Sequence, residues 1–364
     1  MDKELIETHI KLKDTHGFTD KKYDTFFDGR VLQICFYSTG CKCSKNGSCI
    51  MCDYGPIREN NLSKEDIKEI MNEVFDKLTE MPSVLLLNCL GSVLDPQEMP
   101  MENLVTLLEE VSKLDIKTII FETHYSTITT SILDLVKTKL NDKDIAIELG
   151  LESADREVRE KCLNKYIDNA KLIEKIQLVK SFGFDTEANL MFGIPFLTRE
   201  EQIKDTLESI KWCMENGFSK VDLFPVNIKP YTLLYKLYEG GKYSPVTHNN
   251  FIEVLEKIPK EDIGRIHLCW YGNRELNYGE KKTILPTCEN DKYDKIIKFY
   301  EEFNMNKDAK NRIELLENIA SEIDLHSTRR EELEKLIQEV LAKKNELNRV
   351  TQLDKEYKDN SKEM

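Results

Sequence analysis

The chain has 364 residues, of which 66 are acidic, 52 are Lys or Arg and 10 are Cys, and its formal net charge is −14. Neutralised phosphates supply most of the affinity for nucleic acid, so this acidic balance argues against strong unassisted nucleic-acid binding. The first residues, MDKELIETHIKLKD, lack the apolar stretch of a secretory signal, and no run of 18 apolar residues predicts a membrane span. We expect a cytoplasmic protein, in which clustered cysteines favour metal binding or catalysis over disulfides.

Residues 1–29 are predicted to form an N-terminal extension, and from residue 30 short apolar runs alternate with amphipathic helical patterns. The predicted strands are 30–38, 83–90, 116–123, 144–151, 184–194 and 220–228. The predicted helices are 63–80, 101–113, 126–140, 155–182 and 199–216. Ser63 and Thr198 are the N-caps expected for two of them. This alternation predicts an α/β fold with a parallel sheet, either open or partly closed into a barrel.

The remaining chain departs from this alternation. Residues 229–300 are rich in aromatic residues, glycine and proline, and we expect them to form an accessory cap over one mouth of the sheet. Residues 301–364 are highly charged and carry a Leu and Ile stripe at helical spacing. That pattern predicts a small antiparallel pair of helices, followed by a frayed tail after about residue 352.

Four cysteines lie within twelve residues directly after the first predicted strand: Cys41, Cys43, Cys49 and Cys52. In parallel α/β folds the loops after the carboxyl ends of strands carry the chemistry, so this cluster is a candidate site. Two sets of three compete, C-x7-C-x2-C from Cys41 and C-x5-C-x2-C from Cys43. Three thiolates with an open fourth position fit a [4Fe–4S] cluster whose open iron can hold a substrate or cofactor.

Other uses of these cysteines fit the spacing less well. A structural zinc site usually takes four closed ligands from two C-x2-C knuckles, and this loop has one knuckle. A thioredoxin-type C-x2-C opens a helix directly after its strand, whereas CIMC follows a loop of Gly, Ser and Asn. Gly40, Gly47 and Gly55 give the backbone freedom to wrap around a bulky cluster.

The loop resembles the cluster loop of radical S-adenosylmethionine (SAM) enzymes. In that superfamily three cysteines hold a [4Fe–4S] cluster, the open iron chelates the methionine end of SAM, and reduction yields a 5′-deoxyadenosyl radical that abstracts hydrogen. The x7 spacing, with TGC before it and C-x-M-C-x-Y after it, is most similar to the archaeosine synthase radical SAM subunit, a relative of the Elongator catalytic subunit. Further segments that resemble this family are LNCLGSVLDPQEMP (87–100), IELGLESADREVREKCLNK (147–165), ANLMFGIPFLTREE (188–201) and FPVNI (224–228).

The resemblance implies a metal site and a SAM site. It implies Cys41, Cys49 and Cys52 as cluster ligands, with Cys43 as an alternative first ligand. It also implies that Gly91 and Ser92 approach the SAM amino group, although glycine at that position is also explained by a tight turn.

Two acidic residues and one turn complete the SAM site that the resemblance implies. Glu152 would accept hydrogen bonds from the ribose hydroxyls, or else pair with Arg156 or Arg159. Glu122 would help to hold the carboxylate or amino group of SAM, or else pair with a lysine. The segment that contains Gly193 and Ile194 would contact adenine, or else form an ordinary turn.

Three further side chains, in or directly after predicted strands, have expected roles. Cys35 is expected to be a small buried apolar residue. Asn189 is a polar residue at a core position and therefore needs a partner inside the barrel. His124 ends the third predicted strand and is a candidate acid or ligand.

Together these features predict a radical SAM enzyme with a partial (β/α)6 TIM-type barrel over residues 30–228, an accessory cap and C-terminal helices. We expect it to modify a tRNA base, as the resemblance to archaeosine synthase implies, with an RNA-binding partner subunit that supplies affinity for tRNA. Flavodoxin or ferredoxin is the expected reductant. Two alternatives are a radical SAM enzyme for a small-molecule or peptide substrate, and a non-enzymatic zinc-binding adaptor.

Overall fold

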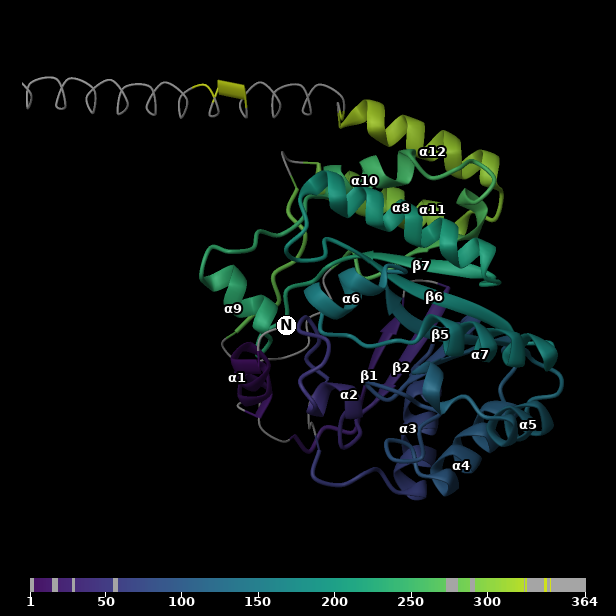
Figure 1. The fold of residues 1–364 in the computed structure, drawn as a ribbon. Helices are drawn as coiled ribbons and strands as arrows, with labels where there is room; N and C mark the ends of the chain where they lie inside the picture. Colours follow the sequence, from purple (N-terminus) through teal and green to yellow (C-terminus); the bar gives the residue numbers. More distant parts are fainter. Residues whose placement is uncertain are drawn as a thin grey trace, which may run out of the picture.

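The chain folds around one curved sheet whose strands follow each other in chain order (Figure 1). A computed structural model describes residues 3–14, 19–27, 30–54, 58–272, 281–288, 292–323, 325, 337, 338 and 341. The strands are β1 (Tyr23–Phe27), β2 (Val31–Phe36), β3 (Val84–Asn88), β4 (Thr118–Thr123), β5 (Asp144–Glu152), β6 (Asp185–Phe192), β7 (Lys220–Pro225) and β8 (Ile266–Leu268). β1 pairs antiparallel with β2, and every pair from β2 to β8 is parallel.

Strand order decides between the open sheet and the barrel. A doubly wound sheet reverses direction at a switch point, whereas a TIM-type barrel adds each strand beside the previous one. The observed order runs from β1 to β8 without reversal, and in the described chain β1 and β8 remain the two edges. The predicted partial barrel is therefore confirmed, and its carboxyl-terminal edge is the place to look for a site.

The six predicted strands correspond to β2–β7, and the two edge strands were missed. β1 lies in the predicted N-terminal extension and β8 in the predicted cap. β1 is a five-residue strand without a buried face and β8 has three residues, so neither produces a long apolar pattern.

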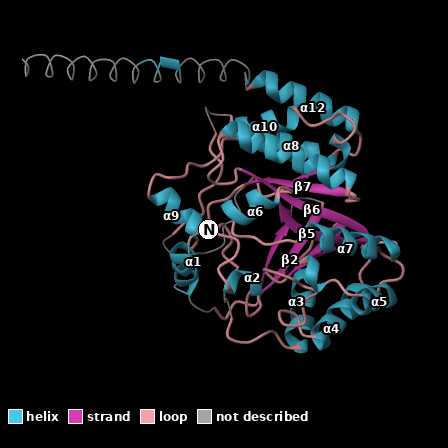
Figure 2. Cartoon of the chain, in the orientation of Figure 1, coloured by secondary structure: helices cyan, strands magenta, loops and turns pink. Residues whose placement is uncertain are grey.

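Helices cover the outside of the sheet (Figure 2). They are α1 (Lys3–Asp14), α2 (Lys42–Lys45), α3 (Lys64–Asp76), α4 (Met101–Ser112), α5 (Thr130–Lys139), α6 (Arg156–Cys162), α7 (Asn169–Ser181), α8 (Arg199–Glu215), α9 (Leu233–Glu239), α10 (His248–Glu256), α11 (Tyr293–Met305) and α12 (Ala309–Glu322), with 3₁₀ turns at Tyr125–Thr127 and Ile263–Arg265. Both predicted N-caps are present as capping boxes, Ser63 with Asp66 and Thr198 with Glu201.

The predicted helix 155–182 is wrong, because the chain forms two helices there. α6 ends at Cys162, Asn164 adopts a left-handed backbone with φ 53°, and Asp168 accepts N–H groups of Ala170 and Lys171 as the N-cap of α7. The interruption brings residues 163–165 and Ile167 into the interior, whereas Tyr166 stays 57% exposed. This segment contacts the cysteine loop, as described below.

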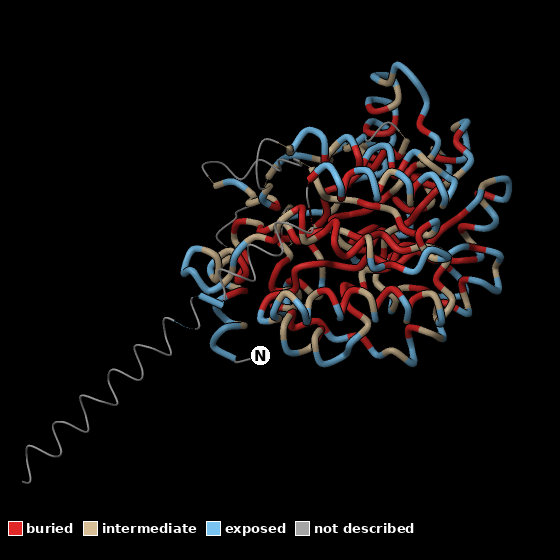
Figure 3. The backbone as a smooth tube through the Cα atoms, turned by 90° about the horizontal axis from the view of Figure 1, so that it is seen from above, coloured by how far each residue is buried: buried red, intermediate tan, exposed pale blue. Residues whose placement is uncertain are grey.

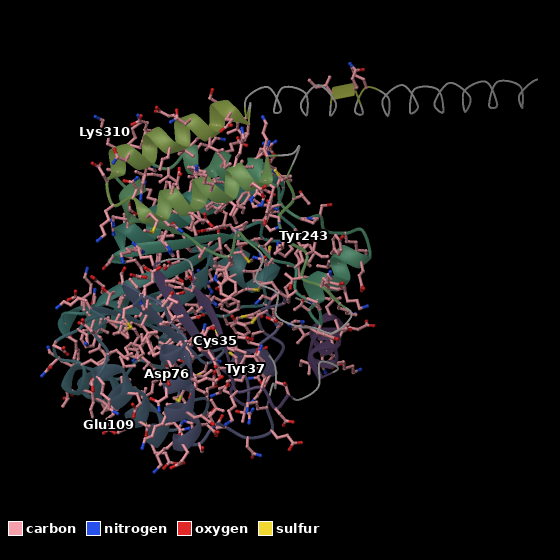
Figure 4. All side chains as sticks on the ribbon, turned by 180° about the vertical axis from the view of Figure 1, so that it is seen from behind. Cys35, Tyr37, Asp76, Glu109, Tyr243 and Lys310 are labelled. Carbon is pink, nitrogen blue, oxygen red and sulfur yellow. The ribbon has the colours of Figure 1, made fainter. Side chains whose placement is uncertain are left out.

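Burial follows these layers. Buried residues lie mainly on the strands, and exposed residues lie on the outer helices (Figure 3). Cys35 and Tyr37 lie toward the interior, while Glu109 and Lys310 lie at the periphery (Figure 4). Cys35 is 1% exposed and packs with Tyr37 and Leu90, which confirms its predicted role as a buried apolar residue.

The C-terminal region packs on the far side of the sheet from α3 and α4 (Figure 1). α11 and α12 contact each other, and α12 also contacts α10. α11 begins at Tyr293, earlier than the predicted boundary at 301. The frayed tail predicted after residue 352 lies outside the described residues. No helix in the described ranges is long and apolar enough to cross a membrane.

Leu87→Ala should lower the free energy of unfolding by about 2–5 kcal/mol, because Leu87 on β3 is fully buried and its truncation leaves a cavity. Denaturant unfolding followed by circular dichroism measures this change. Met81→Ala, at a residue that is 49% exposed, is the control and should change stability by less than about 0.5 kcal/mol. Equal effects of the two substitutions would contradict the position of the core.

Candidate active site

A cavity of about 320 Å³ opens at the carboxyl-terminal edge of the sheet, among residues that follow β2, β3, β4 and β5. It brings together most of the residues that the sequence singled out: Cys41, Cys43, Cys49, Cys52, Gly91, Ser92, Glu122 and Glu152. These residues come from four separate segments of the chain. Their meeting at one edge follows from the parallel sheet.

The loop that carries the cysteines closes on itself. The Cys41 N–H donates to the Tyr54 carbonyl (3.2 Å), and the Cys52 N–H donates to the Cys49 carbonyl (2.8 Å). Cys49 has a left-handed backbone with φ 59°. A non-glycine residue with this conformation needs support from its surroundings.

That support comes from segments distant in sequence. The Ile50 N–H donates to the Leu163 carbonyl (3.0 Å), and Asn164 Nδ2 donates to the Gly47 carbonyl (2.8 Å). On the other side, the first turn of α9 donates the Leu234 N–H to the Ile50 carbonyl (3.2 Å). The loop is therefore anchored by both the α6–α7 connection and α9.

Helix α1 covers the outer side of the same loop, next to α9 (Figure 1). Gly47 has φ 76°, and a Cβ atom at this residue would lie 2.7 Å from Ile6 and 3.1 Å from Ile10. Of the three loop glycines proposed from the sequence, Gly40 and Gly47 both have positive φ, and Gly55 lies outside the described residues.

The thiols differ in their electrostatic environment. A hydrogen bond between Cys41 and Cys43 raises the pKa of Cys41 and lowers that of Cys43. Burial raises the pKa of the Cys49 thiol to about 12, against the opposing effect of the Lys165 ammonium. Because Cys41 and Cys43 adjoin each other in one cavity, both remain candidates for the first ligand.

The donor set fits a cluster. In the described ranges no three His, Cys, Asp or Glu side chains are arranged to hold a single metal ion. In an iron–sulfur cluster each thiolate binds its own iron, so three thiolates need not converge on one point. Thiols spaced around one cavity meet that requirement.

Glu152 forms a buried ion pair, but with a residue that the sequence analysis did not weigh. Its carboxylate contacts the Lys165 ammonium, and both residues are only 9% exposed. The alternative pairing with Arg156 or Arg159 is wrong. Arg156 pairs with Glu160, and Arg159 donates to the Ser153 carbonyl.

Lys165 stays charged in this setting. Burial alone would lower the pKa of its ammonium, but the neighbouring Glu152 carboxylate and Cys49 outweigh that effect and raise it. Glu152 itself follows a register shift at the end of β5 and has φ 61°. The strained backbone directs this carboxylate into the cavity beside the cysteines.

The segment after β3 packs directly against the first cysteine. A Cβ atom at Gly91 would lie 2.0 Å from the Glu98 carboxylate and 3.2 Å from Cys41 Cβ, so only glycine fits there. The Ser92 N–H donates to Glu98 Oε2 (2.8 Å). Burial raises the pKa of Glu98 to about 7.

Glu122 and His124 line the next part of the wall. Glu122 Oε2 accepts a hydrogen bond from Asn88 Nδ2 (2.7 Å), and burial raises the pKa of this carboxyl. Within the described ranges no lysine ammonium lies within 4.0 Å of the Glu122 carboxylate, so the predicted alternative pairing with a lysine is absent there. Burial, together with Lys165 and Lys42, lowers the pKa of His124 to about 4, which keeps the imidazole neutral near pH 7.

Gly193 and Ile194 lie at the end of β6, apart from the residues that line the cavity. Gly193 has φ 100°, and its carbonyl accepts a hydrogen bond from the Tyr243 hydroxyl (2.5 Å). Ile194 is 1% exposed. In the barrel interior below them, Asn189 Nδ2 donates to Glu148 Oε1 (2.6 Å). The sequence predicted a partner inside the barrel for Asn189, without naming the residue.

A smaller inner cavity of about 110 Å³ continues from the first toward β7 and β8. Cys52, Tyr54, Glu122 and Glu152 line both cavities. The inner cavity also meets Lys229, whose ammonium pairs with Asp53 (2.9 Å).

No protein-family model matches the chain. A protein of Methanocaldococcus jannaschii described only as uncharacterized is 28% identical over 285 residues, which cover 73% of this chain and 77% of that protein. Archaeosine synthase subunit beta of Methanosarcina acetivorans is 24% identical over 234 residues, 63% of this chain and 66% of that protein.

The chain is similar to archaeosine synthase subunit beta. This confirms the resemblance drawn from the cysteine spacing. Among solved structures, the archaeal Elp3 of Methanocaldococcus infernus aligns with a TM-score of 0.45 and 16% identity, over 67% of this chain and 58% of that one.

Three charged residues at the site have no role among the predictions from the sequence: Glu98 and Lys165, which are buried, and Lys229, whose side chain is 15% exposed. Glu98 and Lys165 fall within segments 87–100 and 147–165, which resemble the family, so a signal for them existed. Lys229 follows β7 at the start of the predicted cap. Its partner Asp53 is 176 residues away, which no local pattern reveals.

Asp205→Asn should remove a pH dependence of stability. Asp205 on α8 accepts a hydrogen bond from Ser153 Oγ (2.7 Å), next to Glu152, and burial raises its pKa from 3.8 to about 6. The folded state therefore holds the proton more tightly, and stability falls as pH rises from about 4 to 6. The loss is on the order of 3 kcal/mol.

Denaturant unfolding at pH 4 and pH 7 measures this effect for the natural protein and the variant. The variant should lose less stability over this interval, because the amide does not titrate. Identical pH profiles for the two proteins would contradict the raised pKa of Asp205.

Proposed function

We propose that this protein is a radical SAM enzyme that holds a [4Fe–4S] cluster through Cys49, Cys52 and Cys41 and reductively cleaves SAM, in the modification of a tRNA base as in archaeosine synthase. The observation that carries the proposal is the cavity in which the four cysteines meet Glu122 and Glu152 at the carboxyl ends of parallel strands. The similarity to archaeosine synthase subunit beta supports the choice of substrate.

When bound and reduced by one electron, the cluster supplies the electron that cleaves SAM into methionine and a 5′-deoxyadenosyl radical. The protein residues would bind and orient SAM and would shield the radical from water. Glu98 and Glu122 supply acceptors around Gly91 and Ser92 for the SAM amino group. Glu152, held in place by Lys165, would accept hydrogen bonds from the ribose hydroxyls.

We place the adenine near Gly193 and Ile194, at the end of β6. These residues lie beyond the described cavity wall, so this contact would extend the site along the carboxyl edge toward β6. The apolar side chains of the inner cavity would exclude water from the radical.

Two partners follow from the proposal. The electron would come from a low-potential donor, a flavodoxin or ferredoxin. Two of the relatives are subunit beta of archaeosine synthase, a name that implies a second subunit. An RNA-binding partner subunit would supply the affinity for tRNA that a chain of net charge −14 lacks.

After anaerobic reconstitution the protein should contain close to four irons and four sulfides per chain. Cys49→Ala or Cys52→Ala should abolish cluster binding, because each removes one of three thiolate ligands. Cys162→Ala, on the half-buried end of α6, is the matched control and should keep the cluster. Iron and sulfide analysis with absorption spectra measures these outcomes.

The same assay identifies the first ligand. If Cys41 is the ligand, Cys41→Ala should lose iron and Cys43→Ala should retain it. The reverse result would assign the position to Cys43. One zinc per chain in place of iron would support the adaptor alternative and contradict the proposal.

With dithionite as reductant, the reconstituted protein should release 5′-deoxyadenosine from SAM, which chromatography detects. Glu152→Gln should weaken SAM binding about tenfold or more, since the amide removes the charged acceptor proposed for the ribose. Its iron content should stay unchanged, because Glu152 is not a ligand. Unchanged SAM affinity in this variant would show that the ribose lies elsewhere.

The isolated chain should bind tRNA only weakly at about 150 mM salt, because cation release by clustered Lys and Arg supplies most non-specific affinity and this chain is acidic. Gel-shift titrations at two salt concentrations, with and without the candidate partner subunit, measure the binding. Submicromolar binding by the chain alone would contradict the required partner. Failure to bind tRNA even with the partner would favour a small-molecule or peptide substrate.

A further inference from the structure

A buried ion pair joins the cysteine loop to the opposite side of the barrel. Lys229 Nζ lies 2.9 Å from Asp53 Oδ1, and their side chains are only 15% and 4% exposed. Asp53 directly follows Cys52, whereas Lys229 follows β7. The pair therefore links two loops that lie five strands apart in the sheet.

Two aromatic rings enclose the same ammonium. Lys229 Nζ lies 4.7 Å from the centre of the Tyr54 ring and 5.3 Å from that of Trp270. The Tyr54 carbonyl also accepts the Cys41 N–H, which closes the cysteine loop. Lys229 thus contacts both residues that follow Cys52, and it fixes that end of the loop by charge and by cation–π contact.

Burial of charged groups at this position lowers stability unless the charges are paired. Apolar residues of similar volume often replace buried ion pairs without loss of stability. The Asp53 carboxylate and the two aromatic rings surround the Lys229 ammonium and favour its charged form. A positive and a negative charge are consequently held in a buried wall beside Cys52.

We propose that Lys229 and Asp53 are positioning residues that tune electron uptake at the cysteine site, with Lys229 favouring and Asp53 opposing the added negative charge. The inference rests on the cluster assigned under the proposed function. In the step concerned, one electron passes from a low-potential donor to the site and no covalent bond forms or breaks. The reduction potential of an iron–sulfur centre depends on nearby charge and solvent exposure.

The test compares Lys229→Met with Asp53→Asn in the reconstituted full-length protein. Both substitutions break the same ion pair, so a merely structural effect would shift the potential in the same direction in both. The electrostatic role predicts opposite shifts, toward more negative potential for Lys229→Met and toward more positive potential for Asp53→Asn. Dithionite titration in the presence of redox dyes, followed by electron paramagnetic resonance, measures the midpoint.

Each shift should change the ratio of reduced to oxidised protein at a fixed potential about tenfold, which is about 59 mV for one electron. Lys229→Arg keeps the charge and should keep the natural midpoint. The control pair is Lys220 and Glu187, joined at 2.7 Å at the start of β7, where Glu187 is buried. Lys220→Met and Glu187→Gln should leave the midpoint unchanged.

Unchanged midpoints, or shifts of the same sign in Lys229→Met and Asp53→Asn, would overturn the inference. Should Lys229→Met fail to hold iron, Asp53→Asn alone still decides, because a midpoint that is unchanged or lower contradicts the role given to Asp53. Failure of the natural protein to assemble any iron–sulfur centre would instead overturn the proposed function.

Discussion

The candidate site depends on the contact between the cysteine loop and the short segment that separates α6 from α7. A loop with a left-handed residue at Cys49 has little local structure to hold four thiols in place. The Leu163 carbonyl accepts the Ile50 N–H, and the Asn164 side chain donates to the Gly47 carbonyl. The Lys165 ammonium pairs with Glu152 and lines the same cavity as Cys49. One interruption in a helix therefore positions both the thiols and the carboxylate proposed to bind the ribose.

Two ion pairs connect the strands of the sheet to the residues around the cysteines. Glu152 ends β5 and Lys165 lies thirteen residues later, in the connection between α6 and α7, so the pair closes the segment that contains α6. Lys229 and Asp53 make the matching connection from the far side of the sheet. Two ammonium groups therefore lie at the walls that carry the cysteines, Lys165 beside Cys49 and Lys229 beside Cys52. Lys165 opposes the burial that raises the pKa of Cys49, and both positive charges would offset the negative charge of a bound cluster.

Much of this architecture was predictable from local patterns. Apolar runs located β2–β7, capping residues located the starts of α3 and α8, and the cysteine spacing located the site. The short edge strands β1 and β8 were not predictable, because their residues form no extended apolar pattern. The Lys229–Asp53 pair depends on the curvature of the sheet, and the division of residues 155–182 into two helices depends on contacts with the distant cysteine loop.

In the proposed function three cysteines hold a [4Fe–4S] cluster with one open iron that SAM occupies. Mössbauer spectra of protein reconstituted with ⁵⁷Fe, recorded with and without SAM, distinguish that iron from the others. Addition of SAM should change the spectrum of one iron in four and leave the other three unchanged. Four irons that do not respond to SAM, or protein that binds no iron–sulfur cluster, would contradict it.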